Sequence, residues 1–461
     1  MKRFISLAII TSIALSYTVP VLAIQEPAKD NTKIEKKKES EKIKPTANKY
    51  EYINMNWWQS FNDEYLTEYL IRAMENNKDL KMATLTIDEY YQGIIAQRAS
   101  QLPTINVGFL PGLSDIGEGS SDAYALPIFA SYEIDIYGKN SNKTGGVRKL
   151  WESSILDEKA AYISIASAVG STYVNIVKMD AMIDLQEDIV KLRKDIYEMM
   201  EISNAEGLVS TSDLVKANQS YINGVTDLTD LKKNRTKLLH QLAVLTGDSP
   251  NNIEDFKRVD YKKLSFEGNI PESVPSEVIM QRPDYLKAEK MLEKAGLDVK
   301  VARKECLPAI NLGGLIMFNS KNIGSLLTTS NALWGLGGGL LHPIFAGGKL
   351  RANLKHKKVA YEKMIKNYEK VNLTSMQEVN DSLVSVNMDK EKLVKQKEIQ
   401  GLEQKDFELQ KLKYNEGVIA KLDLNQREEN MLSVNKMVYA SEFDCMIDYI
   451  SYYKAVAGQT L

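Results

Sequence analysis

The sequence predicts a mainly helical protein with a few membrane-length β-strands, built from two copies of one unit. Three observations support this fold class. A block of sequence recurs about 205 residues downstream. Two very long tracts contain no proline, and short glycine-bearing extended segments precede each tract. At 461 residues, 44% hydrophobic and 26% charged, the chain is long enough for one large repeated architecture.

The repeat is clearest in two pairs of segments. RASQLPTINVG (98–108) returns as RKECLPAINLG (303–313), and NAEGLVSTSDL (204–214) returns as YNEGVIAKLDL (414–424). In both copies a helical stretch, a Leu-Pro break, two extended runs and a long proline-free tract follow one another. The chain is therefore expected to contain one structural unit twice.

These patterns divide the chain into five segments. Lys2 and Arg3 precede an apolar run that ends in small residues at Ala23, which indicates a signal peptide. The lysine- and glutamate-rich stretch after it cannot bury enough apolar surface to fold alone and is expected to be a periplasmic tether. The predicted segments are a signal peptide (1–23), a tether (24–50), a first repeat (51–250), a linker (251–275) and a second repeat (276–461).

Each proline-free tract reads as a helix pair interrupted once. Gly207 and Gly417 are expected to end the first helix of each pair, and the Ser, Thr or Asp residues that follow start the second. Apolar residues recur three and four apart, which predicts packing seams. The seam positions are Ile176, Met179, Ile183, Ile189, Leu192, Ile196 and Met199 or Met200 in the first tract, and Leu402, Leu409 and Leu412 in the second.

Four extended runs have the length of outer-membrane strands, about 9 to 11 residues. They cover 104–113, 125–136, 309–319 and 333–345. After the signal peptide, no stretch offers the roughly 20 uninterrupted apolar residues of a membrane helix. Because four strands cannot close a barrel and lipid does not tolerate an open sheet edge, closure must come from other copies of the chain.

Charge and reactive residues argue against several functions. The formal net charge is -2, so nucleic acid is not an expected partner. Cys306 and Cys445 are far apart, and His240, His342 and His356 are isolated, so no metal site is indicated. No catalytic constellation is present, and we expect neither an enzyme nor a cofactor.

Three segments, 56–81, 281–314 and 343–353, resemble the TolC-like outer-membrane efflux family, most closely its NodT-type branch. The resemblance implies a homotrimer in which four strands per protomer form a twelve-stranded outer-membrane β-barrel. Twelve long helices continue it as a periplasmic α-helical barrel that tapers to a closed tip. It also implies three partners: a periplasmic membrane-fusion (adaptor) protein, an inner-membrane transporter and the lipid outer membrane.

Glycines at the strand ends are expected to turn the backbone from strand to helix, at Gly138 in the first copy and at Gly347 and Gly348 in the second. The resemblance implies two further sites. The helix-hairpin tips that would contact the adaptor are Gly207, Leu208, Val209, Gly417, Val418 and Ile419. The residues of a periplasmic gate are Asp423 and Tyr414.

The chain also departs from the family pattern. Ile419 stands where the gate network of TolC has an arginine, and Gln426 stands where it has a second acid. Asp213, at the equivalent place in the first copy, is expected to cap its helix. No cysteine precedes Cys306, so no lipid anchor is expected and the barrel alone would hold the protein in the membrane.

The function implied is a passive outer-membrane channel in a tripartite efflux system of the RND type. It would conduct drugs, metals or other small toxic compounds from the periplasm to the outside. Two alternatives remain at this stage: the outer-membrane duct of a type I protein secretion system, and a secreted coiled-coil scaffold without a pore.

Overall fold

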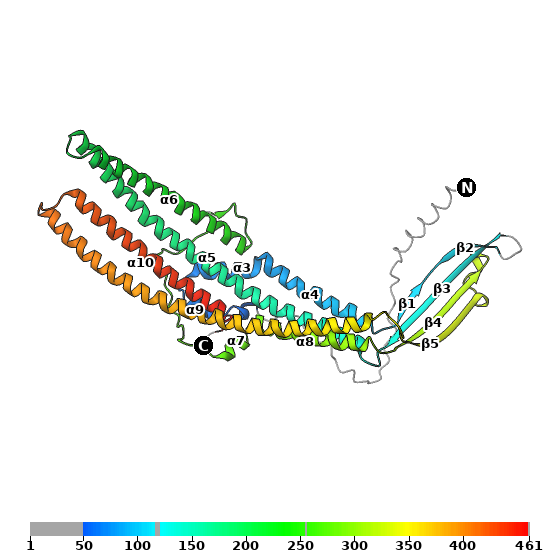
Figure 1. Ribbon diagram of the computed structural model, residues 1–461. Helices are drawn as coiled ribbons and strands as arrows, with labels where there is room; N and C mark the ends of the chain where they lie inside the picture. Colours follow the sequence, from blue (N-terminus) through cyan, green and yellow to red (C-terminus); the bar gives the residue numbers. More distant parts are fainter. Residues whose placement is uncertain (1–48, 116–119, 254–255, 460–461) are drawn as a thin grey trace, which may run out of the picture. The chain divides into compact units, whose positions relative to one another are not determined.

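The computed structural model describes residues 49–115, 120–253 and 256–459 (Figure 1). The predicted signal peptide and nearly all of the predicted tether lie outside the described residues. The first described element is the short 3-10 helix η1 (Lys49–Tyr52), which begins just before the predicted end of the tether. Its residues Tyr50 and Tyr52 pack against the hydrophobic core.

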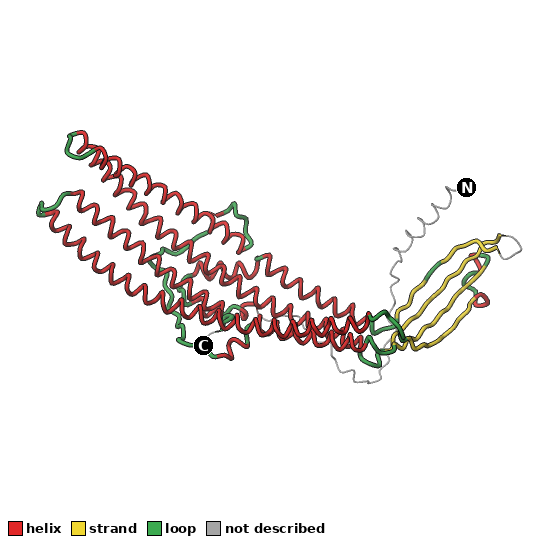
Figure 2. Tube along the Cα trace, in the orientation of Figure 1, coloured by secondary structure: helices red, strands yellow, loops and turns green. Residues whose placement is uncertain are grey.

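Helices make up most of the described chain (Figure 2). In the first repeat they are α2 (Met55–Gln59), α3 (Glu64–Asn76), α4 (Lys78–Ala99), α5 (Lys139–Ala205) and α6 (Thr211–Thr246). In the second they are α7 (Ser276–Met280), α8 (Pro283–Lys304), α9 (Lys349–Asn415) and α10 (Lys421–Ala455), with the short helices η3 (Ile323–Ser325) and η4 (Thr329–Asn331) between strands. Both long tracts are thus helix pairs interrupted once, as predicted.

The strands form one antiparallel sheet in the order β1-β3-β4-β5, with β2 also paired to β3. Their bounds are β1 (Thr104–Val107), β2 (Leu110–Asp115), β3 (Ser120–Ile134), β4 (Ala309–Ser320) and β5 (Ala332–Leu341). β1 and β2 keep one register against β3 and together occupy the width of one strand, so the predicted set of four membrane-length strands is confirmed.

Two strand predictions need correction. The run predicted at 104–113 is divided at Gly108, whose N–H donates to the carbonyl of Pro127 at 2.8 Å. Pro127 has no N–H to return the bond, so the ladder is interrupted there. The strand predicted to reach Phe345 ends at Leu341, because Pro343 cannot donate to the sheet.

The helices α5 and α9 each contain 67 residues, about 100 Å at 1.5 Å per residue. One 18-residue window of α5 has a mean hydropathy of 1.3, which passes a length and composition test for a membrane helix. That window is 61% buried within the protein, as in the core helix of a folded domain. Ser164, Ser167, Thr172 and Asn175 interrupt the apolar part of α5, so the helix does not contain about 20 uninterrupted apolar residues.

The main core joins the two repeats where α2, α3, α5 and α10 meet. Trp58 and Tyr453 are fully or almost fully buried, with ring centroids 5.0 Å apart. Gly170 of α5 lies under Trp58, and a Cβ at Gly170 would approach the indole to 2.3 Å. The hydroxyl of Tyr173 donates to Asp63 at 2.5 Å, and Asp63 also caps α3 by accepting from two backbone amides. This core fixes α5 and α10 to the short N-terminal helices.

The residues of the two predicted apolar seams differ in burial. In the first tract Ile176, Ile183, Ile189 and Leu192 are buried, so this seam is confirmed over that stretch. In the second tract the seam is not covered by the protomer itself. The exposed fractions are 67% for Leu402, 58% for Leu409 and 61% for Leu412.

Candidate functional site

The sheet has one apolar face and one mixed face. Successive side chains on a strand point to opposite faces, and residues paired across strands share a face. One face collects Tyr124, Leu126, Ile128, Tyr132 and Ile134 of β3, Ile310, Leu312, Ile316 and Phe318 of β4, and Trp334, Leu336 and Leu340 of β5. The other face carries Thr104, Asn106, Ser131, Glu133, Asn311 and Asn319, together with apolar residues and several glycines. Such a sheet can meet lipid on one side and water on the other.

Both edges of the sheet are open. Among the described residues, β1 pairs only with β3 and β5 pairs only with β4. On the apolar face of β5, Trp334 is 81% exposed and Leu336 is 83% exposed. In hydrocarbon every backbone N–H and C=O needs a partner, so these edges require neighbouring strands from other chains.

The predicted corner glycines lie at the junctions between sheet and long helices. Gly138, with φ 67°, precedes α5, and Gly347 and Gly348, with φ 56° and 81°, precede α9. These dihedrals are costly for residues with a Cβ, which explains the glycines. Sequence reasoning missed Asp135, whose carboxylate accepts from the backbone amides of Asn140 and Ser141 at 3.1 and 2.8 Å. It thereby caps the first turn of α5.

The two predicted tips have matching backbone geometry. Gly207 and Gly417 both have φ 73°, and a Cβ on either would meet nothing within 4 Å. After each glycine the next amide reaches back to a helix carbonyl at 2.8 Å, from Leu208 to Ser203 and from Val418 to Lys413. This is the glycine-terminated helix end expected from the sequence.

The apolar tip residues lie outermost. Leu208 is 72% exposed and Val418 is 69% exposed, whereas Val209 and Ile419 are half-buried in their turns. An exposed apolar residue at the end of a hairpin gains free energy only from a partner that covers it. The two turns therefore offer matching contact points, and their role in adaptor contact stays a prediction.

The residues predicted to form a gate lie near the second tip without contacting one another. The exposed carboxylate of Asp423 accepts from the backbone amide of Ala420 at 3.3 Å and so caps α10. The half-buried ring of Tyr414 lies under Lys421, whose ammonium is 5.6 Å from the ring centroid. The N-cap residue of α10 is Ala420, which has no side-chain acceptor. Of the two hydrogen bonds of a capping box, α10 therefore has only the one from the Ala420 amide to Asp423. The gating role of both residues stays a prediction.

At the first tip the side chain that caps α6 is Ser210, so the expectation that Asp213 is the cap is wrong. Ser210 accepts from the amide of Asp213 at 3.1 Å and donates to its carboxylate at 2.7 Å. These hydrogen bonds, first from Ser210 and then from Lys216, hold the pKa of Asp213 below its usual value.

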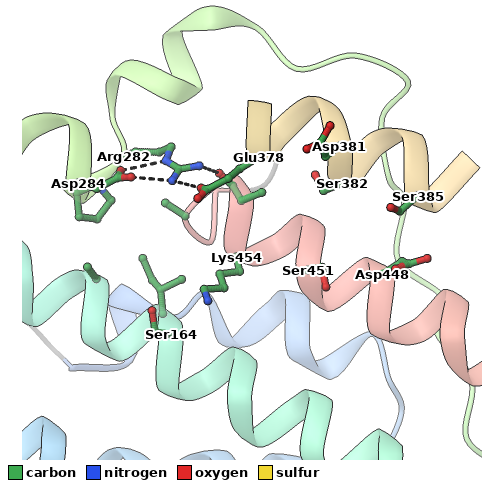
Figure 3. Close-up of a pocket in the computed structure, with 15 residues that line it drawn as sticks. Ser164, Arg282, Asp284, Glu378, Asp381, Ser382, Ser385, Asp448, Ser451 and Lys454 are labelled. Carbon is green, nitrogen blue, oxygen red and sulfur yellow. Dashed lines mark hydrogen bonds and ion pairs between the residues drawn. The ribbon is translucent and has the colours of Figure 1, made fainter. Parts of the chain in front are cut away.

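A polar groove of about 620 Å³ opens between α5, α8, α9 and α10 (Figure 3). Arg282 lines this groove and forms hydrogen bonds to Asp284, to Glu378 at 2.5 Å and to the carbonyl of Ala455 at 2.7 Å. Burial alone would raise the pKa of Asp284, but the hydrogen bonds and charge of Arg282 lower it. This network ties the start of α8 to the middle of α9 and to the end of α10, and it contains no nucleophile paired with a base.

The remaining reactive groups do not assemble into a site. Among the described residues, no group of three His, Cys, Asp or Glu side chains is placed to hold a metal ion. Cys306 and Cys445 are both free thiols, and burial raises the pKa of Cys445 to about 11. Such a thiol is a poor nucleophile near neutral pH.

The sequence and the fold both match known proteins. The family model described as "Outer membrane efflux protein" matches residues 70–248 and 274–441. The chain is 24% identical over 412 residues to the probable efflux pump outer membrane protein TtgC of Pseudomonas putida, covering 87% of this chain and 84% of TtgC. It is also 24% identical over 415 residues to the cation efflux system protein CusC of Escherichia coli K12, covering 88% of this chain and 89% of CusC.

Among solved structures, the CmeC outer membrane channel of Campylobacter jejuni superposes with a TM-score of 0.81 at 22% identity, over 95% of this chain and 94% of CmeC. The open state of the MtrE outer membrane channel of Neisseria gonorrhoeae superposes with a TM-score of 0.76 at 24% identity, over 86% of this chain and 89% of MtrE. The predicted fold class, a mainly helical TolC-like protomer with a membrane sheet, is therefore confirmed.

Proposed function

Because the chain belongs to the outer membrane efflux protein family, we propose that it is the outer-membrane channel subunit of a tripartite efflux system. Its sheet crosses the outer membrane and its long helices extend into the periplasm. The channel is passive and contributes no catalysis. The observation that carries this proposal is a sheet with one apolar face and two open edges, joined through glycine corners to helices of 67 residues.

Three copies complete the channel. Four strand widths per protomer, joined edge to edge through β1 and β5, give a twelve-stranded barrel without a free edge. The NodT-type branch suggested by the sequence is a narrower assignment within the family and remains part of this proposal. The relatives' names cite efflux of toluene, antibiotics, solvents and cations, which favours small toxic compounds as cargo here.

Export by this chain requires two partners, an adaptor protein in the periplasm and an energised transporter of the RND type in the inner membrane. The adaptor covers the exposed apolar tips, Leu208 with Val209 and Val418 with Ile419. Replacing Gly207 and Gly417 with valine strains the φ 73° turns and thickens both tips. Crosslinking to the adaptor and drug export should fall together, while trimer yield in detergent stays unchanged. Intact crosslinking in a folded double variant would contradict this contact.

Asp423 lies close to the second tip, so three copies around the channel axis form an acidic ring that attracts cations. Because its carboxylate also caps α10, alanine would remove both the charge and the cap. Asp423→Asn keeps a side-chain oxygen at the same distance from the backbone and removes only the charge. In planar bilayers this variant should show weaker block by polyvalent cations than the wild type. Equal block in both would exclude Asp423 as the gate acid.

Two other functions are distinguished by specific results. A type I secretion duct has the same fold, but the relatives above are named for efflux pumps. A secreted scaffold without a pore has no use for a sheet with an apolar face. Reconstitution of the purified protein in planar bilayers tests the proposal: discrete channel conductance supports it, and a folded protein without conductance refutes it.

A further inference from the structure

Three polar contacts tie α5 to α10, and therefore the first helix pair to the second. From the core toward the tips, the first contact is the ion pair of Lys178 with Asp444 at 2.6 Å. In the second, Lys436 donates to Gln186 at 2.6 Å, and in the third, Arg193 pairs with Glu429 at 2.7 Å. The contacts advance along α5 by eight and then seven residues and recede along α10 by the same steps. They form one regular ladder on a single antiparallel seam.

The outermost contact is the most elaborate. The Nε and Nη2 atoms of Arg193 both reach Oε1 of Glu429, at 2.8 and 2.7 Å, and Nη1 donates to the carbonyl of Ser220 on α6 at 3.1 Å. The Arg193 and Glu429 side chains are 22% and 21% exposed, so solvent screens the pair less than an exposed one. One guanidinium thus connects three helices.

Close helix packing supports this position of the guanidinium. Gly224 of α6 lies against Arg193, and a Cβ at Gly224 would approach the Arg193 side chain to 3.4 Å. The carbonyl of Gly224 also accepts from Gln186 at 3.1 Å. Two of the three ladder residues on α5 are therefore also bonded to α6, their own hairpin partner.

Between Arg193 and the tips, the described residues form no further hydrogen bond or ion pair between the two helix pairs. In the described part of the chain, no hydrogen bond or ion pair joins α5 to α10 between Glu429 and the tips. The twelve residues from Arg193 to the end of α5 extend about 18 Å. In this stretch Tyr197 stacks on Tyr221 of α6, and Arg427 pairs with Asp406 of α9, so these two interactions stay within their own hairpins.

We propose that the contact between Arg193 and Glu429 is a clamp that holds the two hairpins of each protomer together and keeps the periplasmic end of the channel closed. This inference rests on the proposed channel function. When the end opens, only the part of α10 between Lys436 and the tip moves away from α5, so the two inner contacts remain and only the bonds to Glu429 break. Arg193 stays on its own hairpin through Ser220, so the closed and open arrangements differ by one charged contact per protomer.

The clamp explains how this chain can close without the residues that the family uses at the tip. Ile419 and Gln426 cannot form the ion pairs of that network, as the sequence already indicated. The Arg193 clamp lies deeper, where its side chains are shielded from water. Arg193 and Glu429 are positioning residues, since neither is required to contact the exported compound.

Single-channel recording of purified wild-type and variant trimers tests the clamp. Arg193→Met preserves much of the side-chain volume and removes the charge, whereas Arg193→Lys keeps a cation near Glu429. The methionine variant should raise the ratio of open to closed channels by at least about ten-fold, the effect of losing one charged hydrogen-bonded contact, because each trimer loses three such contacts. Arg193→Lys should restore part of the closed population, which a purely structural role would not predict.

Lys194→Met is the matched control, because Lys194 is the next residue on α5. It pairs only with Glu198 of its own helix at 3.4 Å, and both side chains are more than half exposed. This variant should gate like the wild type. Glu429→Gln removes the charge of the other partner in the same ion pair. This variant provides the test if Arg193→Met does not assemble.

The outcomes separate the clamp from the channel function. If the wild type conducts and both Arg193→Met and Glu429→Gln gate like it, the clamp is wrong while the channel function stands. If folded wild-type trimers show no conductance at all, the proposed function itself is wrong. Equal opening by Arg193→Met and Lys194→Met would also overturn the clamp.

Discussion

The helices α5 and α9 have the same length and corresponding places in the two repeats, yet they are buried very differently. α5 has buried residues from Asn140 to Leu192, along most of its length. α9 buries only Ser375, Val379, Ser382 and Val386. The N-terminal helices and the 256–266 segment pack around α5, whereas among the described residues α9 packs mainly against α8 and α10 and keeps one side exposed. Duplication supplied two similar helices, and only one of them is complete within the protomer.

The exposed side of α9 is apolar at helical spacing. Its exposed large hydrophobic residues are Val359, Leu373, Met376, Val384, Met388, Val394, Ile399, Leu402, Leu409 and Leu412. A surface of this kind is stable in water only when another surface covers it. In the proposed trimer the neighbouring protomer covers this surface, and the contrast between α5 and α9 then separates folding contacts from assembly contacts.

The largest expected effect concerns assembly. Replacing Leu402 and Leu409 with glutamine should remove about 3 kcal/mol of interface free energy per chain, because two buried leucines are lost from each contact. Trimers should dissociate in detergent while the circular dichroism of the helices is retained. Light scattering after size exclusion measures the result, with Lys405→Gln as an exposed control on the same helix. Stable trimers in the double variant would show that this side of α9 is not an interface.

The next largest expected effect is on folding stability, when a glycine of α5 or of α9 is replaced with alanine. In Gly170→Ala the new Cβ would approach Trp58 to 2.3 Å, so the core of α5 must shift, at a cost of about 2 kcal/mol. In Gly401→Ala on α9 the new Cβ meets nothing within 4 Å, and helix propensity favours alanine by up to about 1 kcal/mol.

Thermal unfolding followed at the helical circular dichroism band compares the two alanine variants. Gly170→Ala should unfold at a lower temperature than the wild type, and Gly401→Ala at the same or a higher one. A loss of stability in Gly401→Ala would mean that the neighbouring chain packs tightly against that position. A neutral result for Gly170→Ala would contradict the packing of Trp58 on α5.

The smallest expected effect concerns two carboxylates of α10. On the α5 side, Asp444 pairs with Lys178. On the α9 side, burial raises the pKa of Asp448 to about 7, helped by the nearby carboxylates of Asp389 and Asp444 and opposed by Lys392. Asp448 Oδ2 is buried and has no hydrogen-bond partner in the structure.

The sign of the pH effect follows from the raised pKa. The pKa of an aspartate in the unfolded chain is about 3.9. Between pH 4 and 7 the folded chain therefore holds a proton that the unfolded chain releases. The free energy of unfolding should therefore fall as pH rises through this range. The decrease should be about 1 kcal/mol, because Asp448 is only partly buried. Unfolding at pH 4.5 and 7 measures it, and Asp448→Asn should remove the difference.

The sequence was sufficient for the elements and the repeat because these depend on local signals. Proline-free tracts, positive-φ glycines and period-two or helical apolar patterns act over a few residues. The corners at Gly138 and Gly348 and the turns at Gly207 and Gly417 lie where the sequence predicted them. The end of β5 was misjudged, since the apolar run through Phe345 hid the effect of Pro343 on the ladder.

Contacts between distant segments could not be predicted in the same way. The Arg193–Glu429 pair joins residues 236 apart, and each residue alone looks like one of many charges on a solvated helix. The helical stripe on α9 stays a predicted packing seam, because periodicity does not say whether the partner lies in the same chain. In the described part of the chain, Leu402, Leu409 and Leu412 of this stripe are exposed.

The central claim is that the open sheet edges and the uncovered side of α9 are both completed by threefold assembly. Sedimentation of the purified protein in detergent, corrected for bound detergent, measures the number of chains per particle directly. We predict three chains, and no dissolved protein once the detergent is removed. A single folded chain that stays in solution without detergent would contradict the account.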